Sequence, residues 1–388
     1  MTRSSSFGPK EADVKERLLV AFVDALGPRQ VLELAPPGLT TLPHQRALSG
    51  YLGYSSGALA SILTGSAPNV HGRMCLFSSH GGRGSLAPLR WLGLLPRLVH
   101  ERSALRRRVA KVFALASGLD GYFALHRVPP DAFRWLEVEE RDDLFQTDRV
   151  GGATTFLSRA RSAGVEVFAS PWQLEEDARW QHTFESVRHR PAELTFVYAS
   201  SLDGALHHAG NDSASGRAAL RTIADRIDRT RELLARDGSK VTTLVVGDHG
   251  MADVEHAVDP RAPVARLAGV RVFVDSTLLR LWGPNSAVAE ARRVLEGALP
   301  GLTFLDREAL AREQLPVEGS PYGDAIGVLP EGHLFSPSFV GGRVRGMHGY
   351  HPSGGSAEAA LLADFAIPTH VRSISDVASI VDAQLGLS

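Results

Sequence analysis

Two short clusters of acidic and imidazole side chains carry the chemistry that this sequence suggests. Asp203 and His207 are four residues apart, and Asp248 and His249 are neighbours; each cluster follows an apolar run. Continuous apolar runs are typical of buried parallel strands, and open α/β sheets bind ligands at the carboxyl ends of their strands. Carboxylates and neutral imidazoles are good ligands for divalent metals. The two clusters therefore predict two metal ions at one edge of a sheet.

Two further residues fit the same pattern. Asp24 directly follows another apolar run, and His348 lies late in the chain beside a glycine. A single carboxylate at the end of a strand is commonly a turn former or a helix cap. Three of them in one chain, two with a histidine nearby, favour a metal site instead. His208 competes with His207 for the same role, and spacing alone does not decide between them.

A hydroxyl at the start of an expected helix is the third signal. Ser55 opens the segment 55–64, whose apolar side chains fall on one helical face. The free N–H groups and the positive dipole end of a helix N-terminus stabilise an alkoxide or a bound phosphate. Serine is also a common N-cap residue, so the position by itself allows a purely structural role.

The surrounding pattern predicts how these residues are positioned. Apolar strand-like runs alternate with helical patterns, which indicates an α/β fold with a doubly wound, mostly parallel sheet. We expect one domain over 1–388, interrupted by a helical insertion at 80–150 and a cap insertion at 255–345. The basic run Arg106–Arg108 in the first insertion reads as a solvated helix face.

Composition excludes several classes of function. The formal net charge of -1 gives no basic field for a nucleic acid polymer. Cys75 is the only cysteine, so no internal disulfide forms, and we expect a packed core thiol. No run of about 18 apolar residues predicts a membrane span. The polar residues 1–15 contain no apolar signal core, so we expect a cytoplasmic protein.

Taken in order, the motifs resemble the alkaline phosphatase superfamily, and within it the type I phosphodiesterase/nucleotide pyrophosphatase family. The matching segments, which span almost the whole chain, are Asp24, S-I-L-T-G-S-A-P-N-V-H-G (61–72), D-G-A-L-H (203–207), D-H-G-M (248–251) and H-G-Y (348–350). The resemblance implies an alkaline phosphatase-like core and two metal sites. The first site would take Asp203, His207 and His348, and the second Asp24, Asp248, His249 and the nucleophile oxygen.

The resemblance also places the nucleophile. Counted back from the Thr64-Gly65 pair, it falls on Ser55, with Ser56 as the adjacent alternative. The family uses threonine followed two residues later by proline, whereas this chain has Ser-Ser-Gly at 55–57. Serine serves in other branches of the superfamily. The asparagine that follows the nucleophile in nucleotide pyrophosphatases is absent from 58–60, and the sulfatase signature is absent too.

The resemblance implies a two-metal phosphoester hydrolase that forms a phospho-serine intermediate on Ser55. A small-molecule phosphodiester is the expected substrate; a phosphomonoesterase, phosphonate hydrolase or phosphotransferase stays open. Three imidazoles in the ligand set favour Zn²⁺, although Mn²⁺ also suits mixed nitrogen and oxygen ligands. A binding or scaffold protein is disfavoured, because no ligand position is missing.

One rival interpretation starts from the same serine. Residues 53–57 fit G-x-S-x-G, the nucleophile elbow of α/β-hydrolase esterases, and Asp203 or Asp248 followed by His348 would give the required chain order. The elbow needs a buried strand directly before it, and 42–49 does not read as one. A triad would also leave three of the expected metal ligands unexplained.

Overall fold

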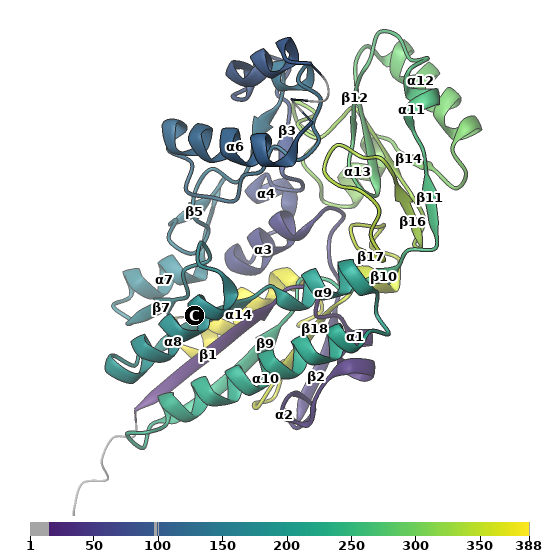
Figure 1. Cartoon of the computed structure of the whole chain (residues 1–388). Helices are drawn as coiled ribbons and strands as arrows, with labels where there is room; N and C mark the ends of the chain where they lie inside the picture. Colours follow the sequence, from purple (N-terminus) through teal and green to yellow (C-terminus); the bar gives the residue numbers. More distant parts are fainter. Residues whose placement is uncertain (1–14, 97–98, 100, 388) are drawn as a thin grey trace, which may run out of the picture.

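A six-stranded sheet forms the centre of the molecule (Figure 1). The structure, a computed structural model, describes residues 15–96, 99 and 101–387. In spatial order the strands are β2 (His44–Leu48), β18 (Ala359–Ala363), β9 (Lys240–Val246), β1 (Glu16–Val23), β8 (Leu194–Ala199) and β7 (Val167–Ala169). β18 runs antiparallel to both of its neighbours, β2 and β9, and the other described pairs of this sheet are parallel. The mostly parallel α/β sheet expected from the sequence is confirmed.

Strand β1 lies in the middle because its side chains are apolar on both faces. Parallel neighbours pair with it on each side, and the register aligns Val23 with Ala199 of β8 and Phe22 with Val246 of β9. The carboxyl ends of the three strands therefore lie at one edge of the sheet. The residues that directly follow β1, β8 and β9 therefore lie close to one another at this edge.

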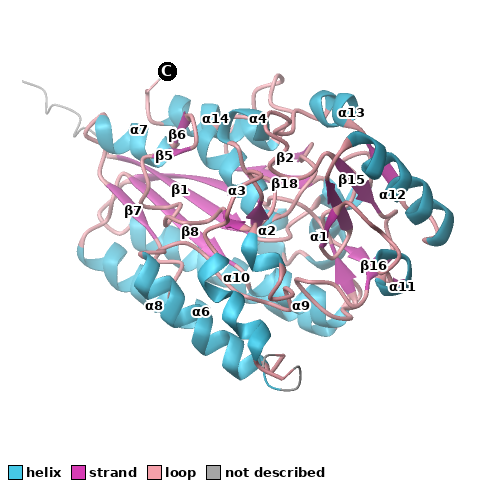
Figure 2. Cartoon of the chain, turned by 90° about the horizontal axis from the view of Figure 1, so that it is seen from above, coloured by secondary structure: helices cyan, strands magenta, loops and turns pink. Residues whose placement is uncertain are grey.

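Helices cover both faces of the sheet (Figure 2). One face packs against α3 (Ser55–Thr64), α7 (Phe156–Ser162) and α14 (Val377–Gln384), and its core includes Val20 and Phe22 of β1. The other face, with Leu19 and Ala21, packs against four helices: α1 (Pro28–Leu34), α8 (Glu176–His189), α9 (Ser201–Ala209) and α10 (Ala214–Leu234). This alternation of core side chains is the period-two pattern of a strand that is buried on both faces.

Residues 252–347 add smaller sheets beside the main one. An antiparallel sheet has the order β12 (Arg271–Val274), β13 (Leu278–Trp282), β15 (Ala325–Val328) and β14 (Thr303–Leu305). The pairs are β10 (Ala252–Asp253) with β17 (Gly346–Met347), and β11 (His256–Val258) with β16 (His333–Phe335). The helices are α11 (Arg261–Val264), α12 (Asn285–Ala298) and α13 (Arg307–Arg312).

Residues 73–154 form a further layer above the strand ends. Its elements are β3 (Phe77–Ser78) paired with β4 (Glu137–Val138), β5 (Arg149–Val150) paired with β6 (Ala153–Thr154), helix α6 (Ser103–Ser117), and the short helices η1 (Ala87–Leu94) and η2 (Ala132–Arg134). Its core also contains Phe273 and Trp282 of the antiparallel sheet. The remaining short elements are α2 (Pro37–Thr40), α4 (Pro68–His71), η3 (Gly355–Ala357) and η4 (Ile374–Asp376).

The structure corrects one local expectation. Arg106 does not lie on a solvated face: it is buried, and its guanidinium donates to the carbonyls of Leu125, His126 and Val128. These backbone carbonyls accept hydrogen bonds from the guanidinium in place of the water molecules that the sequence pattern led us to expect. Residues 44–48 form a strand at the edge of the sheet in which only Leu48 is buried, so the segment before Ser55 is not the buried strand that an esterase elbow needs. As expected, Cys75 is buried.

No helix in the described part of the chain is both long and apolar enough to cross a membrane.

Candidate active site

Three carboxylates meet at the strand ends because their strands are neighbours. Asp24 directly follows β1, Asp248 lies two residues after β9, and Asp203 lies in the first turn of α9, which follows β8. Burial raises the pKa of Asp24 well above its usual value, and two neighbouring carboxylates, Asp248 first, raise it further. Like charges this close are costly in the absence of a cation.

Helix α9 follows β8 directly and carries two of the candidate ligands. Asp203 and His207 are one helical turn apart, so both side chains lie on one face. Nε2 of His207 is 3.2 Å from Oδ1 of Asp203, while its Nδ1 lies 2.7 Å from the carbonyl oxygen of Gly346. His208 is exposed and makes no such contact in the described structure. The structure thus brings His207, and not His208, to Asp203.

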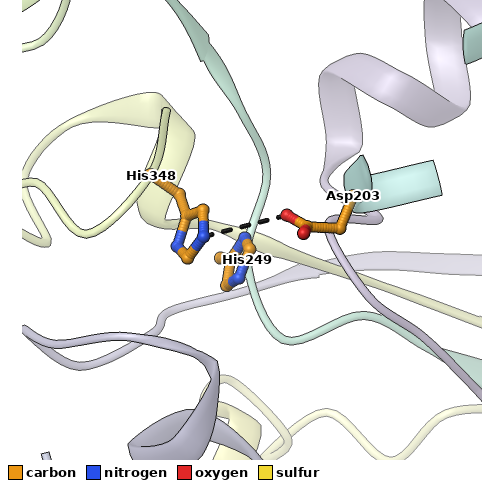
Figure 3. A group of neighbouring side chains, drawn as sticks. All are labelled: Asp203, His249 and His348. Atoms are coloured by element: carbon orange, nitrogen blue, oxygen red, sulfur yellow. Dashed lines mark ion pairs between the residues drawn. The ribbon is translucent and has the colours of Figure 1, made fainter. Parts of the chain in front are cut away.

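Two groups of potential ligand atoms share one histidine. The first contains Asp203, His249 and His348, and the second Asp24, Asp248 and His249; within each group the atoms lie within 4.8 Å of one another. Figure 3 shows the first group gathered around Asp203, with Nε2 of His348 3.8 Å from its Oδ1. His249 is therefore close to both groups, whereas the resemblance assigns it to the second metal site alone.

The second group centres on Nε2 of His249. That atom lies 3.2 Å from Oδ2 of Asp248 and 3.6 Å from Oδ1 of Asp24. The His249 ring also stacks on the ring of His348, with centroids 3.7 Å apart and an interplanar angle of 10°. All six predicted ligand residues thus lie in one continuous cluster.

Hydrogen bonds fix which imidazole nitrogen is free. Nδ1 of His249 lies 2.8 Å from the carbonyl oxygen of Gly250, just as Nδ1 of His207 faces Gly346. A carbonyl only accepts, so Nδ1 carries the proton and the lone pair of a neutral ring is on Nε2. Metal-binding histidines are commonly held in this way. Both free nitrogens face carboxylates.

Several buried polar atoms of the cluster have no hydrogen-bond partner in the described structure: Asp24 Oδ1, Asp203 Oδ1, Asp248 Oδ2 and His348 Nδ1.

Burial opposes a charge on His249, but Asp248 and other carboxylates raise its pKa to about 10. Burial, together with neighbouring imidazoles, lowers the pKa of His348 well below its usual value. Oxygen and nitrogen lone pairs left without partners in this way fit divalent cations.

Ser55 begins α3 and faces this cluster. Its Oγ lies 2.9 Å from Nε2 of His249. The chain enters the helix through Gly53, whose φ of 138° and close approach to the Met74 carbonyl leave no space for a side chain. Ser56, by contrast, is buried. The structure therefore brings Ser55, the expected nucleophile, to the candidate metal ligands.

The P-x-x-H-G motif after α3 is structural. His71 is buried; its Nε2 lies 2.9 Å from Oγ of Ser61, and its Nδ1 accepts from the backbone N–H of Arg73. Burial lowers the pKa of His71 to about 4. The motif joins α3 to the segment that follows it, and among the described residues no hydrogen bond or ion pair connects it to the carboxylate cluster.

Comparison with known proteins shows the family to which the chain belongs. The family model for type I phosphodiesterase/nucleotide pyrophosphatase matches residues 53–301. The chain belongs to this family. It is a phosphoric ester hydrolase, as the motifs implied, and the family is metal-dependent. No curated protein sequence matches.

Solved structures of the family share the fold. Human ectonucleotide pyrophosphatase/phosphodiesterase 5 matches at 14% identity with a TM-score of 0.68, covering 96% of each chain. The murine protein matches at 16% identity and a TM-score of 0.66, covering 96% of this chain and 95% of its own. An inactive variant of the murine protein in complex with AMP matches at 15% identity and a TM-score of 0.66, with 96% of each chain covered.

A cavity of about 540 Å³ opens beside Ser55 and brings in residues that sequence reasoning missed. Tyr198 lines it and donates from its hydroxyl to Oδ2 of Asp24 at 3.1 Å. Glu140, Tyr122 and Trp172 line it as well. A tyrosine near the end of an apolar strand looks like any other core aromatic, so the sequence carried no signal for Tyr198.

Proposed function

We propose that this member of the family is a phosphodiesterase with Ser55 as its nucleophile and two divalent ions as cofactors. One observation carries the proposal: Oγ of Ser55 lies 2.9 Å from the histidine that both ligand groups share. A nucleophile placed between two cation sites suits in-line displacement at phosphorus. Bound there, the metals would supply charge stabilisation for the phosphoryl oxygens and the attacking alcohol.

The ligand sets are part of the proposal. Asp203, His207 and His348 hold one ion, and the other is held by Asp24, Asp248 and His249. The unpartnered carboxylate oxygens support these sets, and so do the Nε2 atoms of His207 and His249, which face carboxylates while each Nδ1 faces a backbone carbonyl. Zn²⁺ is the expected metal, with Mn²⁺ as the alternative. A cytoplasmic location stays a prediction.

The covalent chemistry is carried by the chain itself. Oγ of Ser55 bonds to phosphorus as the bond to the leaving alcohol breaks, and that alcohol departs with a proton. Water then adds to the phospho-serine, and the Ser55 hydroxyl is regenerated. Because Ser55 is the first residue of α3, nearby helix N–H groups lack partners within the helix and favour an anionic group.

The insertions supply the walls of the cavity in this proposal. The expected helical insertion contributes lining residues between Gly121 and Phe145. The expected cap contributes Asp275 and residues between Val340 and Val344. We propose that these two stretches decorate a single catalytic domain and select the substrate. The esterase alternative would leave the carboxylate cluster without a role.

A panel of p-nitrophenyl esters tests the proposal. Bis(p-nitrophenyl) phosphate, p-nitrophenyl phosphate, p-nitrophenyl phenylphosphonate, p-nitrophenyl sulfate and p-nitrophenyl acetate are assayed with Zn²⁺, Mn²⁺ or a chelator. We expect the highest kcat/KM for the diester, and only with metal. A higher kcat/KM for the monoester or phosphonate would establish that alternative, and acetate hydrolysis in chelator would establish the esterase.

A further inference from the structure

Residues 83–118, which lie in the layer above the strand ends (Figure 1), are strongly basic. Eight of these 36 residues are arginine or lysine, and one is acidic. The segment therefore carries a formal charge of +7, whereas the whole chain carries -1. Arg106 is buried against backbone carbonyls, but Arg107, Arg108 and Lys111 are exposed. We call residues 83–118 the basic segment.

Exposed apolar side chains gather in the same segment. Among the described residues, eight large apolar side chains are exposed, and four of the eight belong to the basic segment: Trp91, Leu94, Val112 and Leu115. Single exposed apolar residues are ordinary on a protein surface, whereas a concentration of them marks an interaction site. Leu94 and Leu115 are 87% and 86% exposed, so the folded chain covers little of either.

Helix α6 carries cations and apolar side chains on one exposed side. Its inward side packs on a core that it shares with η1. Residues three or four apart share a helix face, and four exposed residues of α6 have this spacing: Arg108, Lys111, Val112 and Leu115. No ion pair with another described residue neutralises Arg108 or Lys111. The exposed side of α6 is therefore both cationic and apolar.

The short helix η1 repeats the pattern. Side chains three residues apart eclipse each other in a 3₁₀ helix. Pro88, Trp91 and Leu94 have this spacing and are all exposed, and Arg90 is exposed beside them. The buried leucines of η1 enter the same core as α6. Two helices of one layer thus present apolar side chains among cations to solvent.

An anionic bilayer matches this surface better than a second copy of the chain or a nucleic acid does. A two-fold interface between copies would bring the cations of one copy against those of the other. A nucleic acid would pair with the cations through its phosphates, but it would leave the apolar side chains uncovered. At a bilayer, headgroups pair with the cations, and the boundary of the acyl chains accepts tryptophan and leucine.

We propose that the basic segment docks on the surface of an anionic lipid bilayer. Its exposed apolar side chains enter the boundary between headgroups and acyl chains, while its lysine and arginine side chains contact the headgroups. Helix α6 ends at Ser117, and the chain that follows it lines the cavity with Tyr122 and His126. Docking would therefore place the cavity close to the lipid surface.

Co-sedimentation with sucrose-loaded vesicles tests the proposal on the full, metal-loaded chain. Vesicles of phosphatidylcholine alone are compared with vesicles that also contain phosphatidylserine, each at low and at high sodium chloride. We expect partition into the phosphatidylserine vesicles to be at least about tenfold stronger at low salt, and to weaken at high salt because the charges are screened. Equal partition into the two kinds of vesicle, or no partition into either, would overturn the proposal.

Charge variants locate the surface. Arg108→Gln/Lys111→Gln should weaken partition into phosphatidylserine vesicles by at least about tenfold, because it removes two cations from the lipid contact. Arg221→Gln/Arg231→Gln is the matched control: it makes the same change of charge at two exposed arginines of α10 and should bind as wild type does. Equal losses in the two double variants would mean that the vesicles respond to net charge alone, and the basic segment would not be the docking site.

Apolar variants separate a bilayer from a nucleic acid. Leu115→Ser should weaken vesicle partition by at least about threefold, because it removes an apolar side chain from the boundary region. Leu32→Ser is the matched control, since Leu32 of α1 is exposed to the same degree, 85%. It should leave partition unchanged. If Leu115→Ser keeps full vesicle binding and the wild-type chain binds double-stranded DNA more tightly than vesicles, the surface serves a nucleic acid and the proposal is wrong.

Tryptophan fluorescence reports whether the segment enters the bilayer. Trp91 would move from water into the headgroup boundary, so phosphatidylserine vesicles should shift the emission to shorter wavelength. Trp91→Phe should remove the shift and keep most of the partition. A shift that persists in Trp91→Phe would place the lipid contact elsewhere in the chain. Sedimentation velocity without lipid completes the test: a wild-type dimer that Leu115→Ser dissociates would assign the surface to a second copy of the chain and overturn the proposal.

Discussion

The hydroxyl oxygen of Ser55 lies 2.9 Å from Nε2 of His249, although the two residues are far apart in the chain. The contact joins the start of α3 to the loop that follows β9. Because His249 belongs to both candidate ligand groups, the contact ties the proposed nucleophile to the proposed metals. Changes at Ser55, at the ligands and at the metals should therefore all act on the same step.

Removal of the metals should abolish phosphodiester hydrolysis. Burial of three neighbouring carboxylates is unfavourable without cations, so the cluster is expected to be functional only when loaded. Dialysis against a chelator followed by addition of Zn²⁺ or Mn²⁺, with rates measured at each stage, checks this. Undiminished activity in protein shown by mass spectrometry to be free of metal would contradict the two-metal proposal.

Ser55→Ala should lower kcat by at least about 1,000-fold, because it removes the proposed nucleophile. The fold should persist, since Ser55 is only half-buried and its described side-chain contact is with His249. Ser56→Ala is the matched control and should retain most of the activity. Steady-state rates and circular dichroism of both variants provide the measurement. A reversed result would make Ser56 the nucleophile.

His207→Ala should lower the metal content by about one ion per chain, since a site with three protein ligands rarely survives the loss of one. His208→Ala should leave the stoichiometry unchanged, because His208 is exposed, whereas it is His207 whose Nε2 lies 3.2 Å from Oδ1 of Asp203. Metal analysis by mass spectrometry decides between them. Equal metal content in His207→Ala and wild type would remove His207 from the site.

Tyr198→Phe should weaken metal binding by about tenfold, the lower end of the range for partners of metal ligands. The change removes the hydroxyl that donates to Asp24 but keeps the ring that stacks on Phe22 at 5.4 Å. Competition with a chromogenic chelator measures the affinity. Tyr51→Phe, whose hydroxyl pairs with Ser375, is the control and should bind metal as wild type does. Unchanged affinity in Tyr198→Phe would mean that this hydrogen bond does not support the site.

Acid should destabilise the fold through His71. Burial holds its pKa at about 4 in the folded chain, below the ordinary 6.5. The unfolded chain binds the proton first, so stability falls as the pH drops from about 6.5 to 4, by about 3 kcal/mol in total. Urea unfolding of metal-free protein across this range should show a shallower pH dependence in His71→Gln. Identical slopes in the two proteins would show that His71 does not contribute.

The sequence predicted the three candidate aspartates because each follows a recognisable apolar run, and it predicted the histidines from their places in the ordered motifs. It could not predict that β8, β1 and β9 are neighbours, since that order depends on how helices pack on the sheet. It did not predict α9 either, because that helix depends on the packing of Leu202 and Leu206 against the core of the sheet.

The errors at other residues have the same origin. Arg106 was expected in water because a run of arginines is usually solvated, but three carbonyls from 125–128 surround its guanidinium. Those acceptors are distant in sequence and come close only in the folded chain. Glu140 and Trp172 likewise enter the cavity from segments with no pattern of their own.

The strand ends that carry the candidate ligands and the cavity walls should respond differently to heat. Asp24, Asp203 and Asp248 follow the three adjacent strands at the centre of the main sheet, where hydrogen exchange is expected to require global unfolding. Residues 119–145 of the cavity wall contain only η2 and the two-residue strand β4. This wall should exchange its amide hydrogens first. On warming, the protein should therefore lose its preference among substrates, measured as the ratio of their kcat/KM values, at temperatures where it is still active.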